Sequence, residues 1–444
     1  MIISLGLVVR ILYLHLIAHQ PLVSDAASYN DMAADLVMGR HFVPFWPPGL
    51  PLYLAAVKSL FGGSVLAVRL AMLALFPALS FVLYRTTVCL TGEVACGNIA
   101  LLTLAFSPGM ICASVEPVTE LPSAMLLTLV ACCLLMVKSG DSYYLPLILG
   151  TAIGCMALIR PGSLVILLFV PLYLLWRTRN PVPAMVTCLI PAVIVCSWIA
   201  YVHQTTGHLV VINTSNAKNL YLGNNPRTPL YRTWWLGSHH EFEDTPTLTP
   251  DPIVEQARYS KLAWDYIGQH PGLFLLRSFN RVCVFFAFDT YAGAYLIENY
   301  GFPKLVGLAV VALDSAIYCV IGIGCILYIA SLSGLSKRSI HGWVLVGLSL
   351  VYASPYFLAF SHPRYHFPIE PLLMASAAAF VLPFLKSSIV ETPKIAYRRR
   401  GGAAIAILLF LLIQIEFVVI IERARLTGDR QPKSLHRPET KQSA

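Results

Sequence analysis

Charged residues are scarce in this chain of 444 residues. Asp, Glu, Lys and Arg make up only 12% of the sequence, whereas 57% of the residues are hydrophobic, and the mean hydropathy is +0.70. Soluble domains carry about 25% charged residues, so the composition excludes an ordinary soluble fold. It predicts a polytopic membrane protein, because apolar segments of this length need lipid around them.

Other absences narrow the class of protein. None of the eleven cysteines forms a Cys-x-x-Cys pair or joins a Cys/His cluster, so neither a disulfide framework nor a zinc site is implied. The longest basic run is Arg398 to Arg400. It adjoins an apolar stretch and indicates membrane topology rather than nucleic-acid binding. The N-terminus lacks the basic region and cleavage site of a signal peptide, which predicts an uncleaved first helix.

Apolar stretches of bilayer length recur along the chain. A helix crosses the hydrocarbon with about 20 residues, which predicts an all-α fold with about eleven spanning helices, within a range of roughly ten to thirteen. We place them near residues 2–18, 64–84, 96–114, 120–137, 145–159, 162–176, 183–202, 303–333, 342–360, 368–385 and 402–421.

Lys and Arg residues segregate into every second connection between these stretches. The positive-inside rule predicts that these connections are cytoplasmic; they contain Arg85, Lys138, Arg177 and Arg179, Lys337 and Arg338, and the segment from Lys386 to Arg400. The remaining connections would be extracytoplasmic, and they are residues 19–63, 115–119, 160–161, 203–302 and 361–367.

The predicted topology depends on whether the short apolar segment 273–288 crosses the membrane. It carries Arg277, Asn280 and Arg281 near its middle, and each Arg at the centre of a spanning helix costs about 2.5–3.5 kcal/mol. We therefore predict a helix that lies at the membrane interface. If the segment crossed the membrane, every later connection would change side.

The predicted organisation has four parts. They are an N-terminal transmembrane module (1–202) with a first outer loop (19–63), an extracytoplasmic loop domain (203–302) with the interfacial helix, C-terminal transmembrane helices (303–421) and a polar tail (422–444).

The first outer loop is predicted to be amphipathic. Ser24 or Asp25 would cap a helix that runs to about residue 38, and a second apolar piece, residues 50–61, carries Lys58. One face of the first helix has apolar residues at i, i+3, i+4 and i+7: Tyr29, Met32, Ala33 and Leu36.

Three acids lie in or directly beside the predicted outer connections. Asp25 follows the first stretch closely, so its carboxylate could act as a general base or hold a divalent cation; the alternative is a helix cap. Glu116 and Glu120 flank Pro117 between two spans. Acids near hydrocarbon are rare and usually functional, although a short loop also needs polar residues and Glu120 could cap the next helix.

Two arginines lie on the same predicted face. Arg160 contradicts the positive-inside rule, which favours an anionic partner such as a phosphate; the alternative is an ion pair with Glu116 or Glu120. Residues 361–366 combine Arg364 with two imidazoles and an aromatic ring. That combination suits a phosphate at a helix end, and a solvated loop is the alternative.

Several short motifs follow one another along the chain. They are Ser24-Asp25-Ala26-Ala27-Ser28-Tyr29, Trp46-Pro47-Pro48-Gly49-Leu50-Pro51, Thr119-Glu120, Arg160-Pro161, the segment from Leu220 to Pro226, and the segment from Arg364 to Pro371. In this order the chain resembles the GT-C glycosyltransferase superfamily. The most similar branch is the bacterial one of families 39 and 83, which is related to protein O-mannosyltransferases and lipid A aminoarabinose transferases.

The resemblance implies a reaction and roles for particular residues. A sugar would pass from a polyprenyl-phosphate donor to a glycan, lipid or protein acceptor, with inversion, at the outward face of a bacterial inner membrane. Asp25 and Glu120 match the family's catalytic acids. Ala26 stands where the family usually has Glu, which leaves a divalent cation (Mg or Mn) and activity itself open. Substrate-binding roles are implied for Tyr29, Lys58, Glu116, Arg160, Asn224, Asn225, Arg364, Tyr365 and His366.

Two other classes of function stay open at this point. A transporter or flippase of lipid-linked saccharides would need polar groups near the bilayer midplane, where the early stretches offer mainly Arg10 and His15. An inactive GT-C-like scaffold is supported only by Ala26. No nucleic-acid partner is expected.

Overall fold

The computed structural model describes residues 1–40, 44–138, 144–226, 228, 252–332, 336–385 and 397–418. Throughout these ranges the regular structure is helical, without strands. The polar tail predicted at 422–444 lies outside the described residues, and so do residues 229–251 of the predicted loop domain.

Each apolar stretch predicted to span the membrane coincides with one or two helices. Most coincide with one: α1 (Ile2–Ile17), α8 (Glu120–Met136), α9 (Tyr144–Ile159), α11 (Pro181–Thr206), α17 (Lys304–Ser331), α18 (Lys337–Leu358) and α20 (Tyr397–Glu416). Others are divided: α4 (Val65–Leu73) with α5 (Leu75–Thr91), α6 (Val94–Phe106) with α7 (Pro108–Ala113), the 3₁₀ helix η1 (Pro161–Leu168) with α10 (Val170–Thr178), and the 3₁₀ helix η3 (Pro363–Ile369) with α19 (Glu370–Leu385).

Proline explains one of these divisions. Ser107, between α6 and α7, has an extended backbone, and Pro108 follows it at the first position of α7. A proline disfavours helical geometry in the residue before it and cannot donate a backbone hydrogen bond. Hydrophobicity alone therefore predicts the stretch but not its break.

Five helical segments are long and apolar enough to cross a membrane: 65–91, 161–178, 181–206, 304–331 and 338–358. Five shorter apolar helices accompany them within the described residues. The all-helical, membrane character predicted from the sequence agrees with these findings, whereas the number of about eleven spans stays a prediction.

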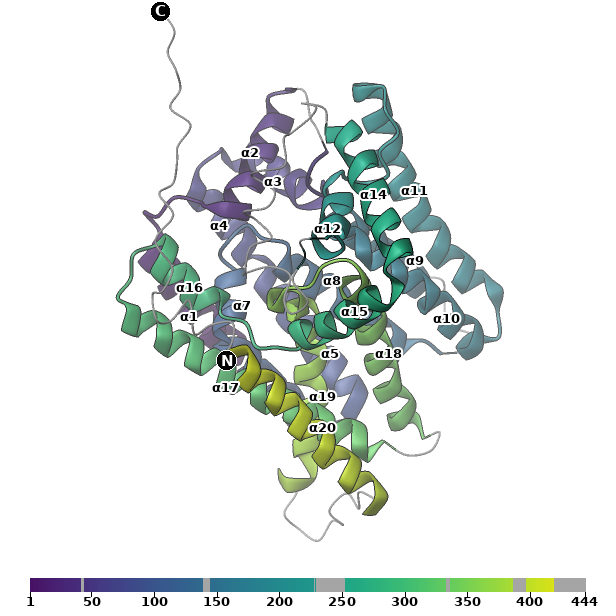
Figure 1. Ribbon diagram of the computed structural model, residues 1–444. Coiled ribbons are helices and arrows are strands. Elements are labelled where there is room, and N and C mark those ends of the chain that lie inside the picture. Colours follow the sequence, from purple (N-terminus) through teal and green to yellow (C-terminus); the bar gives the residue numbers. More distant parts are fainter. Residues whose placement is uncertain are drawn as a thin grey trace, which may run out of the picture.

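Polar and amphipathic helices gather at one end of the molecule. α2 (Ser24–Val37), α3 (Gly49–Phe61), α12 (Ser215–Gly223) and α14 (Pro252–Gln269) lie toward the top of Figure 1, whereas α19 and α20 reach toward the bottom. Three more elements follow α14 along the chain, and they are α15 (Pro271–Phe285), α16 (Tyr291–Ala294) and the π-helical turn η2 (Tyr295–Asn299).

The start of α2 differs from the prediction. Its N-cap is Val23, and no side chain caps it, so the prediction that Ser24 or Asp25 caps this helix is wrong. Both residues lie inside the first turn. The Asp25 carboxylate is therefore available to partners outside its own helix.

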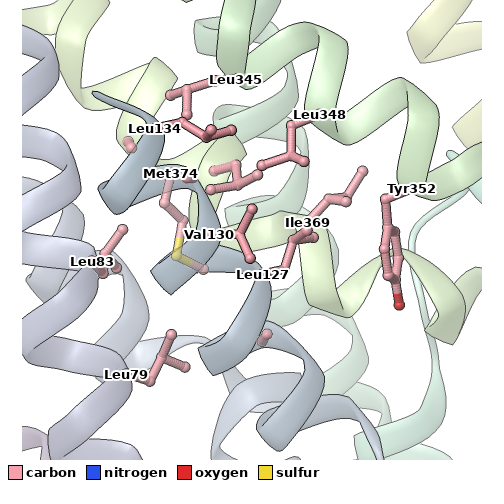
Figure 2. Close-up of a cluster of buried hydrophobic side chains, with 14 of the residues drawn as sticks. Leu79, Leu83, Leu127, Val130, Leu134, Leu345, Leu348, Tyr352, Ile369 and Met374 are labelled. Atoms are coloured by element: carbon pink, nitrogen blue, oxygen red, sulfur yellow. The ribbon is translucent and has the colours of Figure 1, made fainter. Parts of the chain in front are cut away.

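A hydrophobic core holds α8 between α5, α18 and α19 (Figure 2). Ten buried side chains from these four helices and from η3 are labelled there: Leu79, Leu83, Leu127, Val130, Leu134, Leu345, Leu348, Tyr352, Ile369 and Met374. α8 begins at Glu120 and η3 contains Arg364. Packing of α8 against η3 therefore brings these two charged residues to the same end of the core.

Candidate functional site

Four charged side chains form a continuous chain of ion pairs, called here the four-charge cluster: Asp25, Glu120, Arg160 and Arg364. Arg364 Nη2 lies 2.6 Å from Asp25 Oδ2, and Arg364 Nε lies 3.0 Å from Glu120 Oε1. The same Glu120 oxygen lies 2.6 Å from Arg160 Nη2. The structure thus brings together two acids from the first third of the chain and two arginines that lie far apart in sequence.

Helix ends position these four groups. Asp25 is in the first turn of α2, and Glu120 is the first residue of α8. Arg160 is extended between α9 and η1, and Arg364 is in the first turn of η3. Four separate parts of the chain thus supply one charged cluster at the ends of helices, and none of these charges lies in the middle of a helix.

The cluster becomes more exposed from one end to the other. The side chains of Glu120 and Arg160 are 1% and 8% exposed, whereas those of Arg364 and Asp25 are 18% and 30% exposed. Burial alone would lower the pKa of Arg364, but Glu120 and Asp25 raise it well above its ordinary value. A ligand would therefore meet Asp25 and a fully charged Arg364 first.

Aromatic rings support both guanidinium groups. Arg160 lies over the ring of Tyr365 at 5.3 Å and donates a hydrogen bond to the Tyr356 hydroxyl. Arg364 lies over the ring of Tyr291 at 5.0 Å. Each arginine is thus held at its face by a ring and at its edge by a carboxylate, which fixes its plane.

Tyr29 lies beside the cluster on the buried face of α2. Its ring is 5.8 Å from that of Trp46. Burial raises the pKa of Tyr29 well above its ordinary value, and Asp25 and Glu120 add to that effect. Tyr29 therefore stays a neutral hydrogen-bonding group, which is compatible with its predicted substrate-binding role.

Glu116 belongs to a different cluster. Its Oε1 accepts hydrogen bonds from Arg69 Nη2 at 3.1 Å and from the Tyr300 hydroxyl at 2.5 Å, and both Arg69 and Glu116 are fully buried. Arg69 also donates to the carbonyl oxygens of Ile17 and Gln20. Burial raises the pKa of Glu116, and Arg69 opposes that shift. These contacts give Glu116 a structural role, and substrate binding by it stays a prediction.

Arg69→Met should strongly destabilise the protein. The substitution leaves the Glu116 carboxylate buried without its cation, and breaking a buried ion pair costs about 3–5 kcal/mol. The double variant Arg69→Met/Glu116→Leu should recover most of that loss, because neither charge remains. Thermal unfolding of the purified proteins in one detergent measures both. Equal unfolding temperatures for the single variant and the natural protein would contradict the assignment.

Two other predicted site residues, Asn224 and Asn225, hold the end of α12. Asn224 Nδ2 donates to the carbonyl oxygens of Leu220 and Leu358, and Asn225 Nδ2 donates to that of Tyr221. Their predicted substrate-binding roles gain no support from these bonds, which instead fix the backbone.

His366 and Lys58 are not among the residues that form the ion pairs of the four-charge cluster. The ring nitrogens of His366 are 3.0 Å from the carbonyl oxygen of Phe285 and from Glu370 Oε1. Lys58 is in the last turn of α3. Substrate binding by these two residues stays a prediction.

The arginines of segment 273–288 bind protein groups. Arg281 donates to the carbonyl oxygen of Leu358 at 2.8 Å and to Asn224 Oδ1 at 3.0 Å, and Arg277 donates to the carbonyl oxygen of Asn225 at 3.1 Å. Both are buried on one face of α15. This face therefore packs against α12 and the end of α18, and the predicted position at the membrane interface is not tested by these contacts.

The residues of the four-charge cluster do not fit a divalent cation as they stand. Mg²⁺ and Ca²⁺ bind oxygen ligands, chiefly carboxylates, but both carboxylates of the cluster are bound to arginine. The described part of the chain has no group of three or more His, Cys, Asp or Glu side chains that could hold a metal ion. Ala26, buried beside Asp25, offers no further ligand.

Sequence reasoning missed Arg69 and the tyrosines of residues 291–300. Arg69 carries the signal that singled out Arg160, because each is an arginine near the predicted outer face. Tyr291, Tyr295 and Tyr300 lack such a signal, since aromatic residues are ordinary in a loop at a membrane surface.

Of three comparisons with known proteins, two find no match and the third finds solved structures with a similar fold. No family model matches the sequence, and no curated protein matches it. The oligosaccharyltransferase of Archaeoglobus fulgidus in the apo form is similar in structure, with a TM-score of 0.52 and 16% identity over 96% of this chain and 55% of that chain. The AglB oligosaccharyltransferase of the same organism, in complex with an inhibitory peptide and a dolichol-phosphate, has a TM-score of 0.46 and 15% identity over 96% and 56%.

The likeness to the apo enzyme supports a GT-C-like fold. At 16% identity it speaks to the fold alone. The chain also spans only about half the length of these structures, so their activity does not follow from the comparison.

Proposed function

We propose that this protein is a membrane glycosyltransferase similar to the bacterial GT-C branch of families 39 and 83. It transfers a sugar from a polyprenyl-phosphate donor to a glycan, lipid or protein acceptor at the outward face of a bacterial inner membrane. The observation that carries the proposal is the four-charge cluster at one end of a GT-C-like helical fold. It places an accessible carboxylate, Asp25, 2.6 Å from an accessible guanidinium, Arg364.

The proposed reaction is a direct displacement at the anomeric carbon of the donor. Asp25 accepts the proton of an acceptor hydroxyl or amine, whose oxygen or nitrogen attacks the anomeric carbon. The bond from that carbon to the phosphate oxygen breaks, and polyprenyl phosphate leaves with the electron pair. One displacement of this kind inverts the anomeric centre.

Arginine supplies the charge that the leaving group needs. Negative charge grows on the phosphate as the bond breaks, and a preorganised guanidinium stabilises it without reorganising. Arg364 is the more accessible arginine of the cluster, so it would contact the phosphate directly. Arg160 is buried against Glu120 and would hold that carboxylate, and through it Arg364, in place.

Donor binding would release the base. Without a donor, Asp25 and Arg364 neutralise each other. A phosphate offers Arg364 a bidentate partner, so the donor competes with Asp25 for the guanidinium. The freed carboxylate can then accept a proton from the acceptor.

Chelation should leave transfer nearly unchanged. The cluster uses a guanidinium where a cation would otherwise screen two carboxylates, so we expect activity with EDTA within about twofold of activity without it. The assay is repeated with added Mg²⁺ and Mn²⁺ after chelation. Loss of activity that either ion restores would show that a divalent cation takes part.

Donor turnover tests the proposed function. The purified protein in nanodiscs is incubated with radiolabelled undecaprenyl-phosphate hexoses and pentoses, and with bacterial envelope membranes as the acceptor source. We expect release of undecaprenyl phosphate together with label in a covalent product. An inactive scaffold would release none. A flippase would move the lipid across proteoliposomes without any covalent product, and either result would overturn the proposal.

A further inference from the structure

We infer that Tyr295 is a positioning residue that holds the start of α2 and thereby directs the Asp25 carboxylate. The inference rests on the proposed function and deepens it, because it assigns the base a support from the second half of the chain. Tyr295 was not among the residues predicted from the sequence.

The contact is one hydrogen bond to the residue that begins the helix. The Tyr295 hydroxyl donates to the carbonyl oxygen of Val23 at 3.1 Å. Val23 is the N-cap of α2, and the same carbonyl accepts the first helical bond, from the Ala27 amide at 3.4 Å. No side chain caps this helix. Tyr295 thus holds the N-cap residue from outside the helix.

The backbone at this point needs support. Ser24, between Val23 and Asp25, has a φ of 53°, a left-handed conformation that residues other than glycine adopt rarely. Such conformations persist where the surroundings hold them, and they concentrate at functional sites. The direction of the Asp25 side chain depends on this turn, because Asp25 follows it directly.

Tyr295 is itself packed between two other tyrosine rings. Its ring lies 4.9 Å from that of Tyr291 and 5.2 Å from that of Tyr300. It opens the π-helical turn η2, a geometry that is frequent at functional sites. The preceding α16 packs closely on α17, since a Cβ built on Gly293 would lie 2.4 Å from the Gly307 carbonyl oxygen.

The same segment reaches the four-charge cluster, the start of α2 and the buried Arg69–Glu116 pair. Tyr291 lies under Arg364, Tyr295 binds Val23, and Tyr300 binds Glu116. Burial raises the pKa of Tyr295 well above its ordinary value, so its hydroxyl keeps the proton that it donates. These contacts give Tyr295 the geometry of a support rather than of an acid or base.

Tyr295→Phe removes the hydroxyl and keeps the ring. We expect kcat for release of undecaprenyl phosphate to fall about 10- to 100-fold, because a small misplacement of a reacting group costs about that much. KM for the donor should change less than twofold, since Arg364 keeps its contacts with Glu120 and Tyr291. Tyr53→Phe is the matched control, because the Tyr53 hydroxyl also donates to a backbone carbonyl, that of Ala71, at 2.7 Å. Its kcat should stay within twofold.

Ser24→Gly supplies a rescue. Glycine adopts positive φ without steric cost, so the turn needs less support from Tyr295. Ser24→Gly/Tyr295→Phe should therefore recover at least half of the lost factor in kcat. A loss that Ser24→Gly does not relieve would overturn the inference, because Tyr295 would then act elsewhere.

Hydrogen–deuterium exchange gives a readout without turnover. Peptides that cover residues 20–30 should exchange faster in Tyr295→Phe than in the natural protein or in Tyr53→Phe. If no donor is turned over by the natural protein, the proposed function fails while this exchange still decides the positioning role. Unchanged exchange in Tyr295→Phe, or a changed KM with an unchanged kcat, would overturn the inference.

Discussion

Asp25→Asn is expected to lower the rate of sugar transfer strongly while the protein stays folded. Asn has nearly the shape of Asp and can still accept a hydrogen bond from Arg364, but it cannot take the proton of the acceptor. General-base catalysis contributes about 10²- to 10⁴-fold, so kcat should fall by about that factor. Release of undecaprenyl phosphate from the radiolabelled donor measures it, with thermal unfolding as the check on the fold.

Asp35→Asn is the matched control for this variant. Asp35 lies on the same helix, and its ion pair with Arg40, at 3.4 Å, is exposed on both sides. Exposed ion pairs contribute about 0–1 kcal/mol, so this variant should behave like the natural protein. Transfer by Asp25→Asn at the level of Asp35→Asn would exclude Asp25 as the base.

Arg364→Gln should have the second largest effect, and it should act on the donor. The variant loses the accessible positive charge that the leaving phosphate needs, and loss of one such stabilising group typically costs about 10²- to 10³-fold. We expect kcat/KM for the donor to fall by about that factor. Binding of undecaprenyl phosphate should weaken in parallel, which thermal stabilisation by the lipid measures directly.

Two further variants sharpen this result. Arg364→Lys keeps the charge but loses the planar fork that binds phosphate and carboxylate bidentately, so it should recover only part of the activity. Arg40→Gln removes an exposed arginine and should change nothing. If Arg364→Gln turned over the donor like Arg40→Gln, the phosphate would bind elsewhere.

The apolar stretches of the sequence predict most helix positions, because helices in lipid or in the protein core need apolar side chains along their length. They fail at breaks such as the one before Pro108, where backbone geometry decides. A different kind of prediction, that of the helix cap, fails at the start of α2. The capping pattern of Ser24 and Asp25 predicts a local bond, whereas the long-range bond from Tyr295 holds that turn.

The charge pattern of the sequence predicts the members of the four-charge cluster but not all of their pairings. The sequence singles out Asp25, Glu120, Arg160 and Arg364 because each lies at a predicted outer connection. It leaves open whether Arg160 pairs with Glu116 or Glu120, since these acids are close in sequence. Packing decides that question: Glu120 lies at the start of α8 beside Arg160, and Glu116 turns toward the arginine of α4.

The tyrosines that contact the site could not be predicted from a single sequence. Tyr291 and Tyr295 acquire roles only when α16 and η2 fold back against η3 and α2. No periodicity or charge pattern records such a contact, because it depends on how distant elements pack.

A structure of the protein with bound undecaprenyl phosphate, determined by electron cryomicroscopy in nanodiscs, tests the central assignment most directly. The phosphate should lie against the guanidinium of Arg364, with Asp25 released from that arginine and Arg160 still bound to Glu120. A phosphate bound away from Arg364, with the Asp25–Arg364 ion pair intact, would contradict the assignment.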